Sequence, residues 1–137
     1  MGVFKDTDEA ARFIGRIWEL LADDADIGPK LAATNLVMRG IYADPDYQVT
    51  VLCRDGAVKV EHGPSDIAAD ASLRLAADMG HHFWLGAVNL PMALARGQIK
   101  AEGKMSEIMK ILPFLKPAFQ IYRDHLVREG REELLTK

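Results

Sequence analysis

The first regular pattern in the chain is a set of apolar residues spaced three or four positions apart. Within residues 7–21 this set comprises Ala10, Phe13, Ile14, Ile17, Trp18 and Leu21. Such spacing gathers the apolar side chains on one face, so an amphipathic helix is predicted. Asp6 or Thr7 can cap its start, and the acidic residues, glycine and proline within 23–29 predict its end.

From Thr34 onward the apolar spacing shortens to two, which predicts strands. The stretches with this alternation are 34–42, 47–53, 58–62, 71–75 and 99–102. Short turns join the first three, one with the sequence Ala43-Asp44-Pro45-Asp46 and the other containing the hairpin-favouring pair Asp55-Gly56. Consecutive strands joined in this way are expected to form an antiparallel meander.

Helical spacing returns within residues 78–97, in two pieces that separate near Asn89. Pro91 fits the first turn of the second piece, where a missing backbone N–H costs nothing. Gly97 fits the left-handed position at which helices commonly end. Two short helices are therefore predicted between the fourth and fifth strands.

Two further helices are predicted at the C-terminal end, over 105–115 and about 118–135. Pro113 is expected to kink the first, and Pro117 to end or restart it, because proline lacks a backbone donor and clashes with the preceding turn. Gly130 is expected to break or weaken the second.

The order of these elements predicts an α+β fold. It is a five-stranded, mainly antiparallel sheet with helices packed on one face. No internal repeat, low-complexity linker or shift in composition divides the chain, so residues 1–137 are expected to form a single domain.

Composition and charge narrow the classes of function. Hydrophobic residues make up 49% and charged residues 27%, as in a folded globular protein. The net charge is −3 and basic residues alternate with acids, so no nucleic-acid partner is expected. One cysteine, Cys53, permits no intramolecular disulfide. Without a signal-like N-terminus or a run of about 18 apolar residues, the expected location is the cytoplasm.

The sequence predicts no catalytic residue, metal site or cofactor. Adjacent His81 and His82 would point about 100° apart on a helix and could not chelate one ion, so a surface or helix-end position is expected. Cys53 alternates with apolar strand positions, which favours an inert core thiol over a nucleophile paired with His62. Acidic pairs such as Glu132-Glu133 fall at helix ends or turns, where carboxylates are solvated.

A more specific pattern lies between residues 83 and 112. The aromatic-Leu-Gly segment Phe83-Trp84-Leu85-Gly86 precedes a short helix that carries Ala93. A Gly-x-Ile-x-x-x-Gly strand at 97–103 and an apolar, Met-rich helix follow. This arrangement resembles the sterol carrier protein (type two) lipid-transfer family. The resemblance covers roughly residues 7–116 and leaves 117–137 as a C-terminal extension.

The resemblance implies non-enzymatic binding, and transfer, of a fatty acyl, sterol or isoprenoid-like lipid in a cavity between helices and sheet. Phe13 and Trp18 are expected to close one side of this cavity. At most a transient contact with membranes is expected, since the tail's basic residues alternate with acids. The expected lining consists of Phe83, Trp84, Val88, Leu90, Met92, Met105, Ile108, Met109 and Leu112.

The extension leaves alternatives open. Residues 117–137 can cap the cavity mouth, form a homodimer interface through the C-terminal helix, or fill the cavity with Phe119, Ile121 and Tyr122. A filled cavity would make the chain an interaction or dimerisation module on the same scaffold. An enzyme of unknown reaction is a third hypothesis, which requires Cys53, His62 and an acid to converge.

Overall fold

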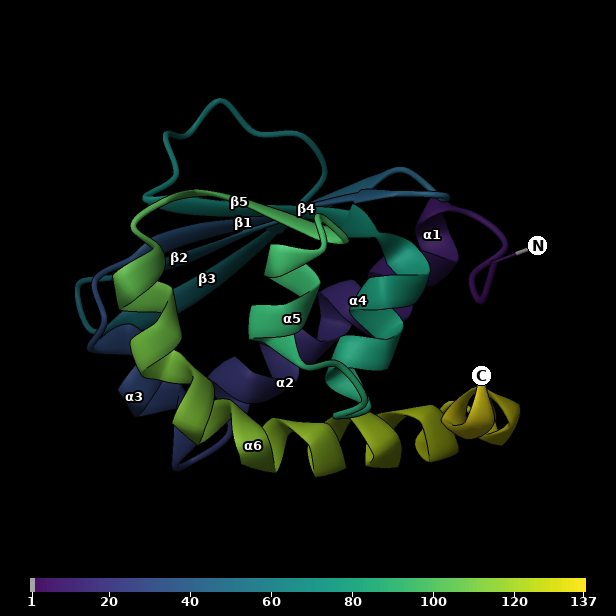
Figure 1. The fold of residues 1–137 in the computed structure, drawn as a ribbon. Helices are drawn as coiled ribbons and strands as arrows, with labels where there is room; N and C mark the ends of the chain where they lie inside the picture. The colour runs from purple at the N-terminus through teal and green to yellow at the C-terminus, as the bar shows by residue number, and fades with distance from the viewer. Residues whose placement is uncertain (1) are drawn as a thin grey trace.

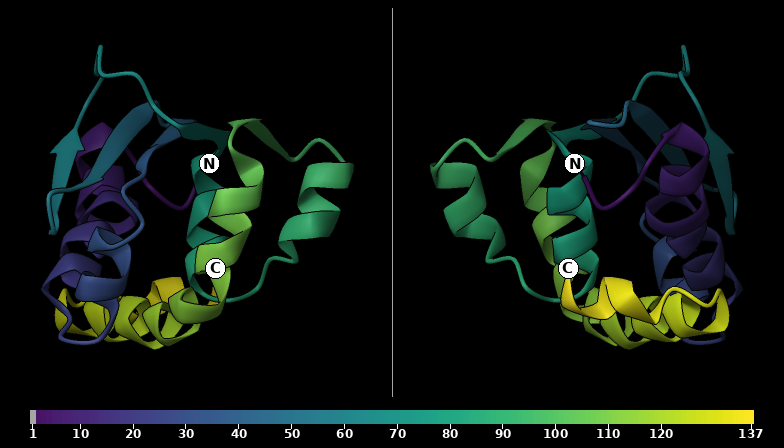
Figure 2. Two further views of the ribbon diagram at one scale, coloured as in Figure 1. Left: turned by 90° about the vertical axis from the view of Figure 1, so that its left-hand side faces the viewer. Right: turned by 90° about the vertical axis from the view of Figure 1, so that its right-hand side faces the viewer.

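The computed structural model describes residues 2–137, except for the side chains of Ile108, Lys110, Ile111 and Phe114. Helices cover one face of a five-stranded sheet (Figure 1). Side views show that the later part of the longest helix, α6, crosses the helical layer on the side away from the strands (Figure 2). The strands are β1 (Val37–Ala43), β2 (Tyr47–Arg54), β3 (Ala57–His62), β4 (Ala71–Ala76) and β5 (Ile99–Gly103).

The sheet order is β3-β2-β1-β4-β5. The pairs β1–β2, β2–β3 and β4–β5 are antiparallel, and β1–β4 is parallel. The predicted meander and the mainly antiparallel α+β fold are therefore confirmed. Gly40 at the middle of β1 lies opposite Val49 on one side and Leu73 on the other. The carboxylate of Asp70 accepts a hydrogen bond from the Val37 N–H at 2.8 Å, which ties the start of β4 to β1.

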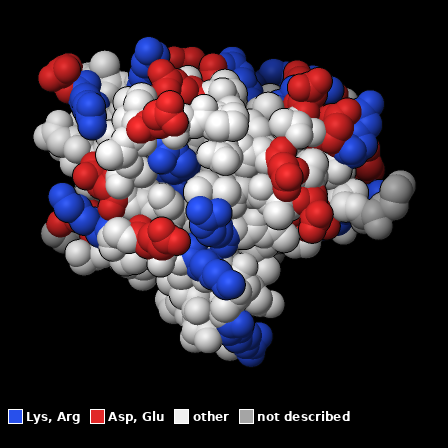
Figure 3. Space-filling view, turned by 90° about the horizontal axis from the view of Figure 1, so that it is seen from above, with Lys and Arg blue, Asp and Glu red and all other residues white. Residues whose placement is uncertain are grey.

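The sheet face away from the helices carries charges of both signs. Lys59 pairs with Glu61 at 3.4 Å, and Arg74 pairs with Glu102 at 3.8 Å. Figure 3 looks onto this face and shows acidic and basic side chains interspersed across it. This view contains no broad area of a single sign.

The predicted first helix follows one path but contains a wider turn. It consists of α1 (Thr7–Ala10), the π-helical segment η1 (Ala11–Gly15) and α2 (Arg16–Asp23). Asp6 caps the start by accepting a hydrogen bond from the Glu9 N–H at 2.9 Å. The π turn changes the local bonding pattern, and the Arg12 carbonyl within it accepts a hydrogen bond from His125 Nε2 at 2.7 Å. The wider turn thereby gains a contact with α6.

A short helix, α3 (Ile27–Ala32), follows where the sequence predicted only a helix end. The Asp24 carboxylate caps it, accepting hydrogen bonds from the Asp26 and Ile27 N–H groups at 2.9 Å each. These bonds stabilise the ionised form and lower the pKa of Asp24. Pro29 lies in the first turn of α3, where no N–H is required. Pro29, which the sequence pattern placed at the end of the first helix, therefore lies at the start of the next helix.

The two helices predicted between β4 and β5 are confirmed as α4 (Ala77–Trp84) and α5 (Leu90–Ala95). The Asn89 side chain caps α5 by accepting a hydrogen bond from the Met92 N–H at 3.1 Å. Pro91 lies in the first turn of α5, and Gly97 has a φ of 73° just beyond its end. Both residues hold the positions that the sequence predicted.

The expectation that Pro117 ends or restarts a helix is wrong, because α6 (Met105–Arg128) continues through both Pro113 and Pro117. Each proline removes one backbone donor, and α6 bends along this stretch (Figure 1). Leu115, which is buried between the two prolines, and Tyr122, which is buried after them, fix the helix against the core. After Gly130, with a φ of 72°, the chain ends in a 3-10 turn, η2 (Glu132–Thr136).

One continuous cluster forms most of the core. It joins the first helix, the inner face of the sheet, and the tail, which contributes Tyr122, Leu126 and Leu134. Removing residues 117–137 would therefore expose core side chains. In the part of the chain that the structure describes, no helix is long and apolar enough to cross a membrane.

Candidate ligand-binding pocket

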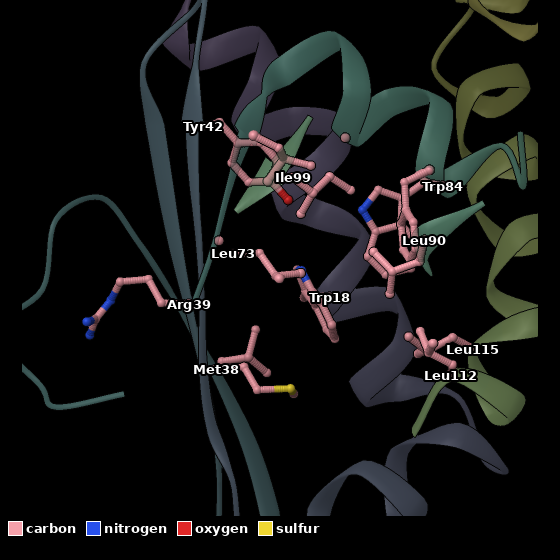
Figure 4. A pocket seen from close by; sticks show the side chains of 15 residues that line it. Trp18, Met38, Arg39, Tyr42, Leu73, Trp84, Leu90, Ile99, Leu112 and Leu115 are labelled. Atoms are coloured by element: carbon pink, nitrogen blue, oxygen red, sulfur yellow. The ribbon is translucent and has the colours of Figure 1, made fainter. Parts of the chain in front are cut away.

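A narrow pocket lies between the inner face of the sheet and the helices (Figure 4). Its volume, counted as the space that the centre of a water molecule can occupy, is about 70 Å³. At ~10–15 Å³ for each water-sized position, this corresponds to roughly five to seven such positions. The lining residues are Trp18, Met38, Arg39, Gly40, Tyr42, Val51, Leu73, Leu75, Gly80, Phe83, Trp84, Leu90, Ile99, Leu112 and Leu115.

Strand β1 forms the long wall of this pocket. Met38, Gly40 and Tyr42 share its inner face because alternate residues of a strand point the same way. At ~3.3 Å per residue, the backbone from Met38 to Tyr42 spans about 13 Å. Leu73 and Leu75 of the parallel neighbour β4 extend the same wall. The pocket is therefore long and narrow, a shape that suits an extended chain.

Two glycines position the ring of Tyr42 at one end of the pocket. A Cβ on Gly40 would lie 2.9 Å from Tyr42 Cε2, and a Cβ on Gly80 would lie 2.6 Å from Tyr42 Cε1. Without those Cβ atoms, the ring fits between β1 and α4. Burial raises the pKa of the Tyr42 hydroxyl to about 12, so the group stays protonated at neutral pH.

Aromatic side chains form the helical wall. The rings of Trp18 and Trp84 meet edge to face with centroids 5.2 Å apart, a favourable arrangement for aromatic pairs. Phe83 contacts Trp84 in the same way at 5.1 Å, and Phe119 contacts Phe83 at 6.2 Å from outside the pocket. Both tryptophans of the chain therefore border the pocket.

The described lining presents no charged group to the interior. Arg39 borders the pocket through its backbone, while its guanidinium points away across the sheet (Figure 4). There it donates to Thr50 Oγ1 at 2.9 Å and to the Ile67 carbonyl. An ionised group inside the pocket would therefore find no countercharge among the described lining side chains.

The structure brings together only part of the lining predicted from sequence. Phe83, Trp84, Leu90 and Leu112 border the pocket, as does Trp18. Phe13 lies instead in the core, stacked on a neighbouring aromatic ring.

The other predicted residues lie elsewhere. Val88 and Met92 border a shallow surface hollow beside α5, and the Met92 side chain is 46% exposed. Met105 is half-buried at the margin of the core, and Met109 is 38% exposed. The side chain of Ile108 lies outside the described residues.

The sequence interpretation missed the strand half of the lining. Alternation placed Met38, Gly40 and Tyr42 on one face of their strand, but nothing in it identified the face that meets the helices. A glycine two positions before a tyrosine was the available signal, since it leaves room for the ring to lie flat on the sheet.

His81 lies in the last turn of α4, which is the helix-end position expected from the sequence, but its side chain is fully buried and not on the surface. Its Nδ1 is 2.8 Å from the Tyr122 hydroxyl, and its Nε2 is 2.8 Å from the Leu134 carbonyl. The ring thus joins α4 to both parts of the tail, and burial lowers its pKa. His82 is half-buried and bonds the carbonyl of Lys137.

The tail packs beside the pocket. Among the described lining residues Leu115 is the last in sequence, so Phe119, Ile121 and Tyr122 do not occupy the pocket. Tyr122 is buried against His81 instead.

Cys53 and His62 do not converge. Cys53 is buried opposite Val58, whereas His62 lies opposite Val49. Burial raises the pKa of the Cys53 thiol, which makes it a poor nucleophile. His62 bridges the Tyr47 hydroxyl at 2.5 Å and the carboxylate of Glu19 on α2 at 2.8 Å.

No protein-family model and no curated protein matches the chain. Solved structures of sterol carrier proteins do match it. Sterol carrier protein 2 from Yarrowia lipolytica in its apo form is 17% identical, with a TM-score of 0.61 over 80% of this chain and 98% of that one. The sterol carrier protein domain 2 of Helicoverpa armigera is 17% identical, with a TM-score of 0.63 over 78% and 85%. Sterol carrier protein 2 from Aedes aegypti in complex with palmitate is 17% identical, with a TM-score of 0.56 over 78% and 94%.

A larger enzyme contains a similar unit. The sec-alkylsulfatase Pisa1 from Pseudomonas sp. is 19% identical, with a TM-score of 0.57. This chain spans only 14% of that enzyme, and 68% of this chain is covered. The three sterol carrier protein matches cover 98%, 85% and 94% of their own chains. The chain therefore has the sterol carrier protein type-two fold, as the motif at residues 83–112 predicted.

Proposed function

We propose that this chain reversibly binds an extended apolar ligand, such as a fatty acyl or isoprenoid-like lipid, in the pocket beneath β1. The observation that carries the proposal is the apolar interior that the described lining residues of β1, β4 and helices α2, α4 and α6 form. The palmitate complex of the Aedes aegypti protein, which shares the fold, supports the same class of ligand.

Burial of methylene groups would supply the affinity. Each buried methylene contributes about 0.8 kcal/mol, so about six contribute about 5 kcal/mol before the costs of association. A longer chain requires the lining side chains to move apart. Desolvation and shape, with no covalent step, account for such binding.

The C-terminal extension fits a structural role in this proposal. Tyr122, Leu126 and Leu134 are buried within the same chain. Val127 is the large apolar residue of that segment that stays exposed. A homodimer through the C-terminal helix stays a prediction from the sequence, with no contact that favours it over a monomeric carrier.

Tryptophan emission provides the test, because Trp18 and Trp84 both border the pocket. Titration with decanoate, methyl decanoate and 1-decene should change the emission of the wild-type protein saturably for at least one of the three. Leu73→Phe places a larger side chain in the pocket and should weaken this response at least tenfold. Leu52→Phe makes the same change on the opposite face of the sheet and should leave it intact.

Failure of all three compounds to bind the wild-type protein would overturn the proposal. Equal responses in Leu73→Phe and wild type would also overturn it, because the ligand would then lie outside the pocket. Both variants require a check of cooperative thermal unfolding before titration.

A further inference from the structure

The Tyr42 hydroxyl is a polar group set within an otherwise apolar wall. The side chain is 8% exposed, and its oxygen points into the pocket toward Trp84 (Figure 4). The ring lies in the space that the missing Cβ atoms of Gly40 and Gly80 leave on its two edges. The hydroxyl therefore cannot turn away to solvent without a change in the strand–helix packing.

The hydrogen bonds of this hydroxyl are incomplete. The indole N–H of Trp84 donates toward the Tyr42 oxygen. Among the described residues, no acceptor takes the Tyr42 proton. The other two tyrosines differ, since Tyr47 bonds His62 and Tyr122 bonds His81. The Tyr42 proton is therefore available inside the pocket, where a ligand oxygen can accept it.

The described lining side chains bring no charge into the interior, and this limits what that ligand oxygen can be. A buried carboxylate requires a cation or several donors to replace its hydration. The described lining offers only the Tyr42 hydroxyl and two indoles, since the guanidinium of Arg39 lies across the sheet. A neutral carbonyl or ether oxygen needs no countercharge and accepts one hydrogen bond well.

We propose that the pocket selects lipids whose end carries a neutral oxygen acceptor, as in an ester, ketone or quinone carbonyl, and that Tyr42 donates to it. This inference rests on the proposed function and names the ligand class of the same site. The apolar chain then runs along β1 from Tyr42 toward Met38, beside Leu73 and Leu112.

Three chain-matched compounds at about pH 8, where a free carboxyl is ionised, test the selection in the wild-type protein. Methyl decanoate carries a neutral carbonyl, decanoate carries a charge, and 1-decene carries no oxygen. We expect methyl decanoate to bind at least tenfold more tightly than decanoate. Equal affinity for decanoate and methyl decanoate would overturn the ligand class, whereas failure of all three to bind would overturn the proposed function itself.

The variant Tyr42→Phe tests the role of the hydroxyl. Methyl decanoate should bind this variant about fivefold to tenfold more weakly, the usual effect of one lost hydrogen bond, with 1-decene unchanged. Tyr47→Phe removes a hydroxyl outside the pocket and should change neither affinity. Equal losses for methyl decanoate and 1-decene in Tyr42→Phe would contradict the assignment, since Tyr42 would then act by packing alone. If Tyr42→Phe does not fold, the wild-type comparison decides.

Discussion

Gly80→Ala tests the packing that positions Tyr42 in the pocket. Two effects oppose each other at this site. Alanine stabilises a helix interior by about 1 kcal/mol relative to glycine, and Gly80 lies within α4. Against this, a Cβ at Gly80 would lie 2.6 Å from Tyr42 Cε1, closer than carbon atoms normally approach. Overpacking of this kind costs about 1–3 kcal/mol.

The clash should outweigh the helix preference. We expect Gly80→Ala to lower the free energy of unfolding by about 1 kcal/mol. In a Tyr42→Val background the ring is gone, so the same substitution should raise the free energy of unfolding by about 1 kcal/mol. The effect of Gly80→Ala on the free energy of unfolding should therefore change sign between the two backgrounds. A double-mutant cycle measures this difference as the coupling energy between Gly80 and Tyr42.

Equilibrium unfolding in urea, followed by circular dichroism, measures all four proteins of the cycle. Ser106→Ala, at an exposed position of α6, serves as the control and should leave the free energy of unfolding nearly unchanged. If Gly80→Ala destabilises both backgrounds equally, the Tyr42 ring is not what the new methyl group meets. The placement of the hydroxyl in the pocket would then lose its structural basis.

Three further outcomes follow from buried polar groups. Tyr122→Phe leaves His81 Nδ1 without its partner, so urea unfolding should show a loss of about 1–3 kcal/mol, and no loss would contradict the bond. Because burial lowers the pKa of His81 in the folded state, the unfolded chain takes up the proton first. The free energy of unfolding should fall as pH drops below about 6.5, by at most about 1.4 kcal/mol per pH unit. In His81→Gln this pH-dependent loss of stability should be absent. An unchanged pH dependence in that variant would mean that other groups cause it. Cys53, buried with a raised pKa, should react with a thiol reagent only as fast as the protein unfolds, and rapid labelling of the native protein would contradict its burial.

The sequence predicted the helices and strands well where local residue patterns determine the backbone conformation. Strand alternation identified all five strands, and Pro91 and Gly97 fixed the limits of α5 because their backbone requirements are local. The same reasoning failed for Pro29 and Pro117. Pro29 costs no hydrogen bond because it lies in the first turn of α3. Pro117 does remove one, and side-chain packing decides that α6 continues past it.

The pocket was less accessible to sequence reasoning because it depends on pairing across the sheet. Phe83 and Leu112 belonged to a recognisable motif, whereas Tyr42 reaches the same space only because β1 pairs with β4 and turns that face to α4. His81 illustrates the same limit. Its burial depends on Leu134, far along the chain, whose position the local pattern around His81-His82 does not encode.

Native mass spectrometry of the purified protein, with lipid extraction and identification, tests the central claim most directly. The account predicts a co-purifying lipid in stoichiometric amount that carries a neutral oxygen at one end, and its loss in Leu73→Phe but not in Leu52→Phe. A protein that is empty as purified and stays empty after incubation with methyl decanoate, decanoate or 1-decene would contradict the claim that the pocket beneath β1 binds lipid.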